Sequence, residues 1–349
     1  MRLINQSDVP GEKRKSPRRA HEPTRPHISL PLGRILPIAV LALATASTAY
    51  PWGAQGHAAI GLVAEQRLSP VADRNIRRIL GNDDLASIAS WMDQLRGATS
   101  GFGPLAANPE ARQFAQKNPH NDEWHYDNLP LGEARYADND PFSRADDVVH
   151  EINIAVLVLE GRSTAVSPRI ALYMIVHFVG DLHQPLHVAT GYFDLSDPSH
   201  PVLDTDPKLA VGRENDKGGN ELSFGSQRSE ELHAYWDIAL PEKIAGLSDP
   251  AVLAKLLAAA IPPGGWASPG DHHAWAEGWA TESLAAARQA YAPLTFGVAD
   301  TADGKLRRIH ITMPADYDAT AGPIARERLA KAAYHLAELL NAIDWPDRN

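Results

Sequence analysis

The stretch SPRIALYMIVHFVGDLHQPLH, residues 167–187, decides the expected fold. It opens on Ser167 and Pro168, a pair typical of a helix N-terminus because serine caps the helix and proline fits its first position. Apolar residues follow until Pro185, which cannot continue a helix. His177 and Asp181 stand four residues apart in this expected helix, so both point to one face.

Helical signals also dominate the rest of the chain. Ser69 and Pro70 begin a segment that Gly81 closes, and Ser143 is expected to open another helix with apolar residues at helical spacing. Further helices are expected near residues 228–240, 271–290 and 323–343.

Signals for other structure are few. Ile309, Ile311 and Met313 alternate as in a β-strand, and residues 188–217 are rich in Asp, Pro, Ser and Gly, which predicts a long surface loop. No repeat or long linker follows residue 52. We therefore expect an all-α fold, a single mainly helical domain over residues 52–349 with a minor β-hairpin.

Histidines and aspartates form the candidate site. His233 and Asp237 repeat the four-residue spacing of His177 and Asp181, and His187 lies just beyond Pro185. The chain has no cysteine, and imidazole and carboxylate are the ligands that zinc accepts when thiolate is absent. Apolar neighbours surround both pairs, so a compensating partner is expected. Three upstream candidates, each unremarkable alone, are His57, Asp93 and His125.

The N-terminal segment differs from the rest. Residues 1–34 are rich in Pro, Arg and Lys, an apolar run covers 35–44, and small residues follow at 46–49. These are the three parts of a secretory signal, although a basic disordered tail would share the composition. The apolar run is too short to span a bilayer. We expect an N-terminal extension plus secretory signal over residues 1–51 and a secreted or periplasmic protein without stable membrane association.

The charge balance limits how the chain could hold nucleic acid. Residues 1–51 contain 8 of the 33 basic and 3 of the 43 acidic residues, so the remainder has 25 basic and 40 acidic residues and a net charge of −15. This is the wrong sign for neutralising phosphates along a nucleic acid. A nuclease with this balance needs a local source of positive potential, such as metal ions.

Five sequence blocks together resemble the trinuclear-zinc single-strand nucleases of the S-one/P-one type, which are related to zinc-dependent phospholipase C. In chain order they are Trp52-x4-His57, Ser90-Trp91-x-Asp93-x2-Arg96, Val176-His177-Phe178-x-Gly180-Asp181-x2-Gln184-Pro185-Leu186-His187, Gly218-Gly219-Asn220 and Leu232-His233-x2-Trp236-Asp237.

The resemblance implies three zinc ions. The first ion would be held by Asp93, His125, His177 and Asp181. The second would be held by His187, His233 and Asp237. The third would take the amino nitrogen and carbonyl oxygen of an N-terminal Trp52, with His57 and a bridging Asp181.

The resemblance also implies the roles around the metals. Asp93 and Arg96 would be catalytic, with Arg96 steadying the charge that grows on phosphorus; its planar guanidinium suits phosphate oxygens. Tyr126 would stack on a base, while Asp127 and Asn220 would contact it. Stacking on an aromatic ring stabilises binding by about 1–3 kcal/mol per base and needs an unpaired base, which favours single strands.

The expected function is a secreted zinc-dependent phosphodiesterase. It would hydrolyse single-stranded DNA and RNA by attack of zinc-bound hydroxide, and by resemblance would leave 5′-phosphate products and act as a 3′-nucleotidase on 3′-nucleotides. A zinc-dependent phospholipase C is the nearest alternative, but the short gap between Trp52 and His57 and the final Asp237 favour the nuclease. A non-catalytic zinc-binding helical protein is the other alternative, and it would not require Arg96 and Tyr126.

Two features depart from the family. The third zinc requires Trp52 to be the mature N-terminus, yet the small residues predict cleavage after Ala49, so an X-Pro dipeptidyl peptidase would have to remove Tyr50 and Pro51. The 188–217 segment is also longer than usual and is expected to cover the site. Six further histidines and three charged residues fit none of the blocks and are expected to be surface or structural: His183, His200, His272, His273, His310, His335, and Arg326, Arg328 and Lys331 on a solvated helix face.

Overall fold

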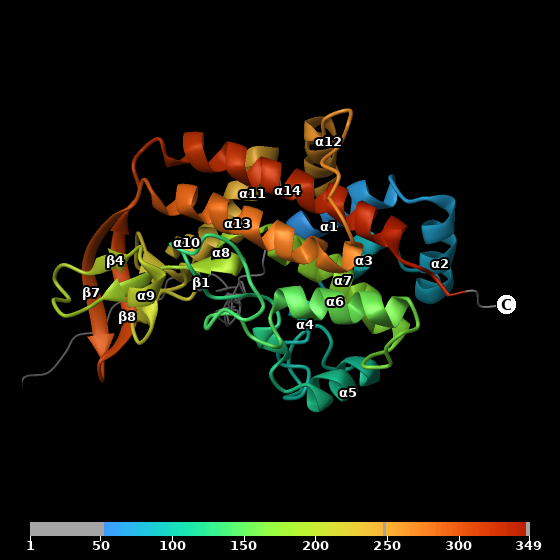
Figure 1. Cartoon of the computed structure of the whole chain (residues 1–349), viewed down its shortest axis with the longest axis horizontal. Helices are drawn as coiled ribbons and strands as arrows, with labels where there is room; N and C mark the ends of the chain where they lie inside the picture. The colour runs from blue at the N-terminus through green and yellow to red at the C-terminus, as the bar shows by residue number, and fades with distance from the viewer. Residues whose placement is uncertain (1–51, 247–248, 347–349) are drawn as a thin grey trace, which may run out of the picture. The chain divides into compact units, whose positions relative to one another are not determined.

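The computed structural model describes residues 52–246 and 249–346, and all of them belong to one compact unit. The N-terminal extension and the expected secretory signal lie outside these residues. Within them, no helix combines the length and apolar character needed to cross a membrane. The expected mainly helical fold is confirmed, with small sheets added at one end of the unit (Figure 1).

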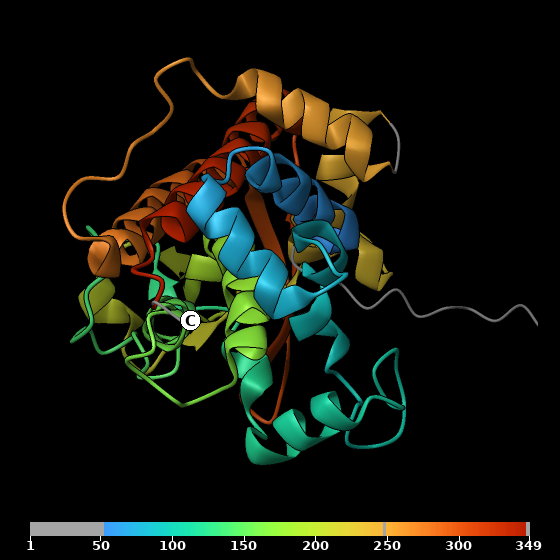
Figure 2. The ribbon, with the colours of Figure 1, turned by 90° about the vertical axis from the view of Figure 1, so that its right-hand side faces the viewer.

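The central helix is α7, Pro168–His183. It begins as the sequence predicts, because the Ser167 side chain accepts the backbone N–H of Ile170 and Pro168 occupies the first turn. Every residue from Ile170 to His183 is buried. The helix packs against α6 (Val148–Leu159), α13 (Trp275–Tyr291), α14 (Tyr317–Ala342) and α1 (Gly53–Glu65), which surround it in Figure 2.

The remaining helices are shorter and complete the shell around this core. The Ser69 cap and Gly81 stop confirm the helix predicted between them. The shorter α-helices are α2 Pro70–Leu80, α3 Leu85–Ile88, α4 Trp91–Gln94, α5 Pro109–Lys117, α8 Pro185–Val188, α9 Pro207–Ala210, α10 Leu232–Ala234, α11 Leu240–Ala245 and α12 Pro250–Ala260. The 3₁₀ turns are η1 Asn121–Glu123, η2 Arg228–Glu230 and η4 His272–Ala274, and η3 Tyr235–Ala239 is a π-helical turn.

Within residues 52–246 and 249–346, three small sheets lie beside the helices. The expected hairpin joins β7 (Thr295–Ala302) to β8 (Lys305–Thr312), and β6 (Leu222–Ser223) pairs parallel to β8. A second sheet has the order β4 (Val202–Asp204), β3 (Tyr192–Asp194), β5 (Glu214–Asn215), all antiparallel. The pair β1 (Leu129–Pro130) and β2 (Ala189–Thr190) is parallel. This pair ties the segment after His125 to the segment after α8.

Several sequence predictions are wrong in detail. Residues 188–217 are not a simple surface loop, since they carry β2 to β5 and α9, and Phe193 is buried. Asp147, not Ser143, caps α6, because its carboxylate accepts the N–H groups of Val149 and His150.

The last predicted segments also differ from the structure. The segment expected as one helix near 228–240 is broken into 3₁₀, α and π turns, and the last helix begins at Tyr317, before the expected start at 323. Met313 lies just after β8. Arg328 does not face solvent: its guanidinium is buried and donates to Glu282, Ser283 and the carbonyl of Trp279.

Candidate metal centre and nucleic-acid cleft

The first cluster combines side chains from three parts of the chain. Helix α7 supplies His177 and Asp181, α4 supplies Asp93, and the segment before β1 supplies His125. Asp181 Oδ2 lies 2.9 Å from His125 Nδ1 and 3.2 Å from His177 Nε2. The Asp93 oxygens lie 3.9 and 3.8 Å from the same two nitrogens. The structure therefore brings together all four residues that the resemblance assigns to one ion.

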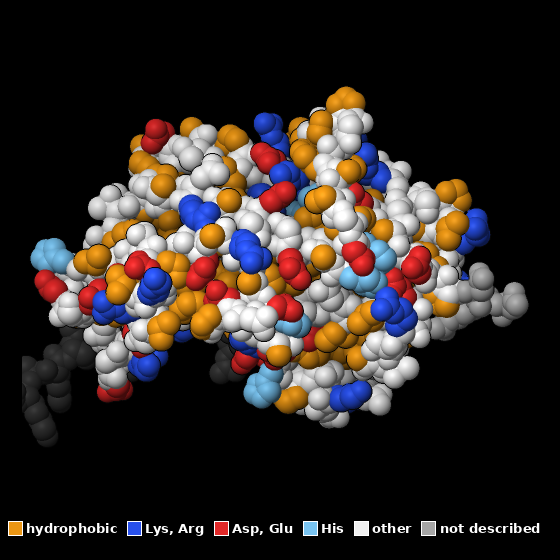
Figure 3. Space-filling model, in the orientation of Figure 1, with side chains coloured by type: hydrophobic (Ala, Val, Ile, Leu, Met, Phe, Trp, Pro, Cys, Tyr) orange, Lys and Arg blue, Asp and Glu red, His pale blue; other side chains and the backbone are white. Residues whose placement is uncertain are grey.

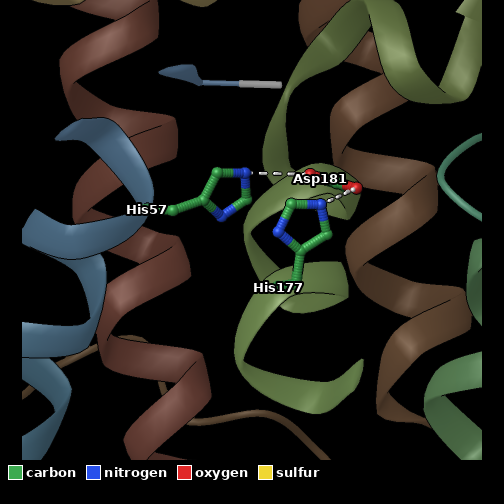
Figure 4. A group of neighbouring side chains, drawn as sticks. All are labelled: His57, His177 and Asp181. Carbon is green, nitrogen blue, oxygen red and sulfur yellow. Dashed lines mark ion pairs between the residues drawn. The ribbon is translucent and has the colours of Figure 1, made fainter. Parts of the chain in front are cut away.

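Asp181 also reaches a neighbouring helix. Its second oxygen, Oδ1, lies 3.1 Å from Nε2 of His57 in α1, so one carboxylate faces His177 on one side and His57 on the other (Figure 4). The His57 and His177 rings stack with their centroids 4.2 Å apart. This geometry fits the predicted bridging position of Asp181.

A second cluster joins α8 to the segment α10–η3. His233 Nε2 lies 3.2 Å from Asp237 Oδ2, and His187 Nε2 lies 3.9 Å from Asp237 Oδ1. Gln184 donates its side-chain N–H to Asp237 Oδ1 over 2.8 Å, and the backbone nitrogen of Trp52 donates to the same oxygen over 3.3 Å. All nine predicted metal ligands thus gather around α7 and its neighbours.

Backbone carbonyls fix the orientation of three of the imidazoles. The Nδ1–H groups of His177, His187 and His233 each donate over 2.7 Å, to the carbonyls of Ala89, His125 and Gly218. Because Nδ1 of each ring faces a backbone carbonyl, Nε2 is the nitrogen that points into the cluster. Metal-binding histidines are held in this way, with the outer nitrogen hydrogen-bonded and the inner one available.

The cluster contains many buried polar atoms without a hydrogen-bond partner. Among the described residues these include atoms of five of the expected ligands: both ring nitrogens of His57, both carboxylate oxygens of Asp93, Asp181 Oδ1, His187 Nε2 and Asp237 Oδ2. Buried polar atoms are normally hydrogen-bonded. Orphaned lone pairs that converge from imidazole and carboxylate groups are a donor set that fits divalent cations, zinc in particular.

Burial and the neighbouring charges also shift the pKa values of the expected ligands. Burial raises the pKa of Asp93 to about 8, although nearby His177 opposes the shift. Burial lowers the pKa of His57 to about 4 and that of His125 to about 3. For His177 burial acts downward, but Asp181 and Asp93 outweigh it and raise the pKa to about 9. Two buried carboxylates therefore attract positive charge at the centre of the cluster.

A glycine makes the close approach of α1 and α7 possible. A Cβ added to Gly180 would lie 2.6 Å from Nδ1 of His57, closer than such atoms ever approach. The carbonyl of Gly180 also accepts the indole N–H of Trp52 over 2.9 Å. Gly180 in the Phe178-x-Gly180-Asp181 block is therefore required for His57 to reach Asp181.

A cleft of about 590 Å³ opens beside the two clusters. Its walls include His125, His187 and His233 from the clusters and all four residues outside them that were predicted to act on the substrate: Arg96, Tyr126, Asp127 and Asn220. Arg96 lies 3.9 Å from Asp93 and is 42% exposed, so it can reach a ligand in the cleft. The structure brings the predicted ligands and the predicted substrate contacts to one place.

The cleft walls have aromatic and acidic groups suited to a base. One face of the Tyr126 ring lies against the Arg144 guanidinium, 5.8 Å from the ring centroid. Asp127 is buried, its Oδ2 has no partner among the described residues, and burial raises the pKa of its carboxyl well above the usual range. Such a carboxyl is suited to hydrogen-bond a ligand in the cleft.

The sequence reasoning missed several residues at this site. Lys217 and Arg228 line the cleft and add positive charge to it. Asp216, fully buried, accepts the N–H groups of Gly191 and Gly219 and the hydroxyl of Thr190, which fixes the turn carrying Asn220. The position of Asp216 before the Gly-Gly-Asn block was the available signal, because a buried acid commonly orders a glycine-rich turn.

The six histidines expected to be surface or structural fall into three groups. His200 and His310 are exposed, each beside one aspartate, while His183 and His335 are buried and contact each other. His272 and His273 lie next to Glu160, away from the residues above. Trp279 is buried, and Trp266 and Trp275 pack against the core.

Buried imidazoles and carboxylates beside a cleft, in a mainly helical fold, are a candidate site for metal-assisted hydrolysis. The sequence model of the S1/P1 Nuclease family matches residues 52–344, and the chain belongs to this family. It is therefore a nuclease, a hydrolase that acts on nucleic acid.

Two relatives of known name span most of the chain, and a third covers a little over half of it. Nuclease S1 of Aspergillus oryzae is 27% identical over 319 residues, covering 89% of this chain and 98% of the relative. Nuclease P1 of Penicillium citrinum is 28% identical over 310 residues, covering 84% and 97%. Endonuclease 2 of Arabidopsis thaliana is 25% identical over 211 residues, covering 57% and 59%. These relatives favour the nuclease over the phospholipase and the non-catalytic alternatives.

Proposed function

We propose that the protein is a secreted or periplasmic nuclease that uses three zinc ions to hydrolyse single-stranded DNA and RNA to 5′-phosphate products, and that it also acts as a 3′-nucleotidase. Family membership supports the nuclease activity. The donor set supports zinc, and the cleft beside it supports an unpaired nucleotide as the substrate.

The residues that would hold the ions follow from the clusters. Asp93, His125, His177 and Asp181 would hold one ion; His187, His233 and Asp237 a second; and Trp52, His57 and Asp181 a third. When bound, zinc supplies a hydroxide nucleophile near neutral pH and neutralises charge on the phosphate oxygens. The chain's own part is to fix the ligands, through the carbonyls that hold the outer imidazole nitrogens and through the amide of Gln184 at Asp237.

The substrate contacts are assigned by their place in the cleft. Arg96 would hold the phosphate beside the Asp93 cluster, and Tyr126 would stack on a base with the face opposite Arg144. The unpartnered oxygen of Asp127 and the side chain of Asn220 would contact the base edge. A base must leave its duplex to enter such a cleft, which accounts for a preference for single strands.

The third ion would require cleavage before Trp52. The position of the Trp52 backbone nitrogen supports this site, because it lies 3.3 Å from Asp237 Oδ1 and a free amine there would face the clusters. Secretion rests on the expected signal within residues 1–51. N-terminal sequencing of the exported protein tests both, with a start at Trp52 expected; fully active enzyme that begins at Tyr50 would contradict this assignment.

The observation that carries the proposal is the convergence of orphaned, buried imidazole and carboxylate atoms beside the cleft. Hydrolysis of single-stranded DNA, RNA and a matched duplex should be measured before chelation, after chelation and after adding zinc back. We expect loss and recovery of activity, faster turnover of single strands, 5′-phosphate products and release of phosphate from 3′-nucleotides. Activity that survives complete chelation would contradict the proposal, and hydrolysis of phosphatidylcholine instead would favour the phospholipase.

A further inference from the structure

Glu160, His272 and His273 form a cluster outside the cleft and the residues that would hold the three ions. Glu160 is the C-cap residue of α6, whereas His272 and His273 form the turn η4 that leads into α13. One ligand atom from each of the three lies within 4.8 Å of the others. On the face shown in Figure 3, histidine, acidic and basic side chains lie together over α6 and the adjoining end of α13.

The distances suit a small divalent cation. The Nε2 atom of His272 lies 2.8 Å from Glu160 Oε1, and that of His273 lies 3.4 Å from Glu160 Oε2. Zinc binds imidazole and carboxylate at about 2.0–2.2 Å in a tetrahedral arrangement, which places neighbouring ligand atoms about 3.3 Å apart. Small side-chain shifts would therefore complete a site of two histidines and one glutamate, with the fourth position open to water.

The carboxylate of Glu160 needs a cation at this place. Its side chain is 1% exposed and stands at the C-terminal end of α6, where the helix dipole is already negative. The cation that faces it is Arg162, whose Nη1 lies 2.9 Å from both Glu160 Oε2 and His273 Nε2. The Arg162 side chain is 59% exposed, so this ion pair contributes little and the guanidinium can swing into solvent.

We propose that Glu160, His272 and His273 bind a further divalent transition-metal ion, zinc being the probe of choice, in exchange for the Arg162 guanidinium. The ion would join the end of α6 to the turn before α13, two segments separated by more than a hundred residues. Its role would be to stabilise the fold, because a ligand that binds only the folded state raises the unfolding temperature.

The test titrates zinc into the metal-replete enzyme and follows both binding and the unfolding temperature. We expect one added equivalent in the wild-type protein and a rise of several degrees. His272→Ala and His273→Ala should each weaken this binding at least tenfold, and Arg162→Ala should strengthen it severalfold by removing the competing cation. The matched control is His200→Ala, since His200 is exposed and faces the single carboxylate of Asp197; it should leave the added equivalent intact.

Equal zinc binding in wild type and His272→Ala, or no added equivalent in both wild type and Arg162→Ala, would overturn the site. Glu160→Gln keeps the side-chain shape and serves as a second variant if a histidine variant folds poorly. Hydrolysis of single-stranded DNA should stay unchanged in all five variants, so failure of this site and failure of the proposed zinc nuclease are separately visible.

Discussion

Helix α7 carries two buried polar regions that differ in how their atoms are satisfied. Around Asp181, imidazole and carboxylate atoms face one another and several have no hydrogen-bond partner. Around His183, two residues further along, the partners are all protein groups: Val179 O accepts from the ring, His335 contacts its other nitrogen, and Arg328 donates to its carbonyl.

The comparison separates a structural polar cluster from a ligand site. Arg328 bonds to Glu282 and Ser283 as well, so its buried charge is compensated within the chain. Near the Asp181 cluster, the guanidinium of Arg96 lies 3.9 Å from Asp93, and its side chain is 42% exposed rather than buried as that of Arg328 is. Along α7, converging buried atoms without hydrogen-bond partners therefore distinguish the proposed ligand site from the structural cluster around His183.

The largest effect is expected at the bridging carboxylate. Asp181→Asn weakens the residue that we propose to be shared by two ions, so activity on single-stranded DNA should fall about 10³-fold, equivalent to roughly 4 kcal/mol of transition-state stabilisation. Bound zinc, measured by elemental analysis, should fall with it. Asp197→Asn, an exposed control, should change neither quantity. Full zinc content and activity in Asp181→Asn would contradict the assignment of the Asp181 region as a ligand site.

The second variant tests the polar cluster around His183. Arg328→Met leaves the Ser283 hydroxyl and backbone carbonyls without their buried donor, so the free energy of unfolding should fall by about 3 kcal/mol. Denaturant unfolding measures the change, and zinc content per folded molecule should stay constant. The control is Arg326→Met, exposed on the same helix. Loss of zinc from folded Arg328→Met protein would show that the two regions are not independent.

A third variant tests the packing of α1 on α7. Gly180→Ala places a Cβ against the His57 ring, so we expect loss of one zinc ion and a fall in activity of about 10²-fold, as for a displacement of about 1 Å at a reaction centre. Gly278→Ala in α13, where a Cβ meets nothing, is the matched control. Unchanged zinc content in Gly180→Ala would mean that His57 is not a ligand.

The last variant concerns Glu151, a buried acid that lies in neither region. Burial, with Asp146 and Asp147 nearby, raises the pKa of Glu151 from its usual 4.5 to about 7. The folded state therefore holds this proton more tightly, and the stability it contributes is full below pH 4.5 and is lost as pH rises through 7. Relative to Glu151→Gln, the wild-type protein should lose about 3 kcal/mol of unfolding free energy across that window.

Unfolding measured at several pH values in both proteins checks the sign. Glu110→Gln, an exposed acid in the first turn of α5, is the control and should show no such window. A wild-type protein that gains stability relative to Glu151→Gln as pH rises would contradict this prediction.

The sequence predicted helix α7 and its His177–Asp181 pair better than the contacts that other helices make with them. Caps and proline stops placed α2 and α7, and spacing along one helix placed His177 beside Asp181, because these signals are local. The meeting of His57 and Asp93 with them came only from resemblance, since contacts between distant helices leave no mark in local spacing. The burial of Arg328 was missed because a basic residue on an amphipathic helix looks the same whether it faces water or a buried serine.

The segment 188–217 shows the same limit. Its Asp, Pro and Gly content predicts turns, and turns are present, but the pairing of β3 with β4 and β5 depends on partners that composition does not reveal. His272 and His273 gave no signal either, because Glu160 lies more than a hundred residues away in the sequence.

Diffraction from crystals of the mature protein at the zinc absorption edge tests the central claim most directly. The account predicts three anomalous peaks around Asp181: one beside Asp93 and His125, one beside His187 and His233, and one beside Trp52 and His57. Absence of peaks there in active crystals, or peaks only at other surfaces, would contradict it.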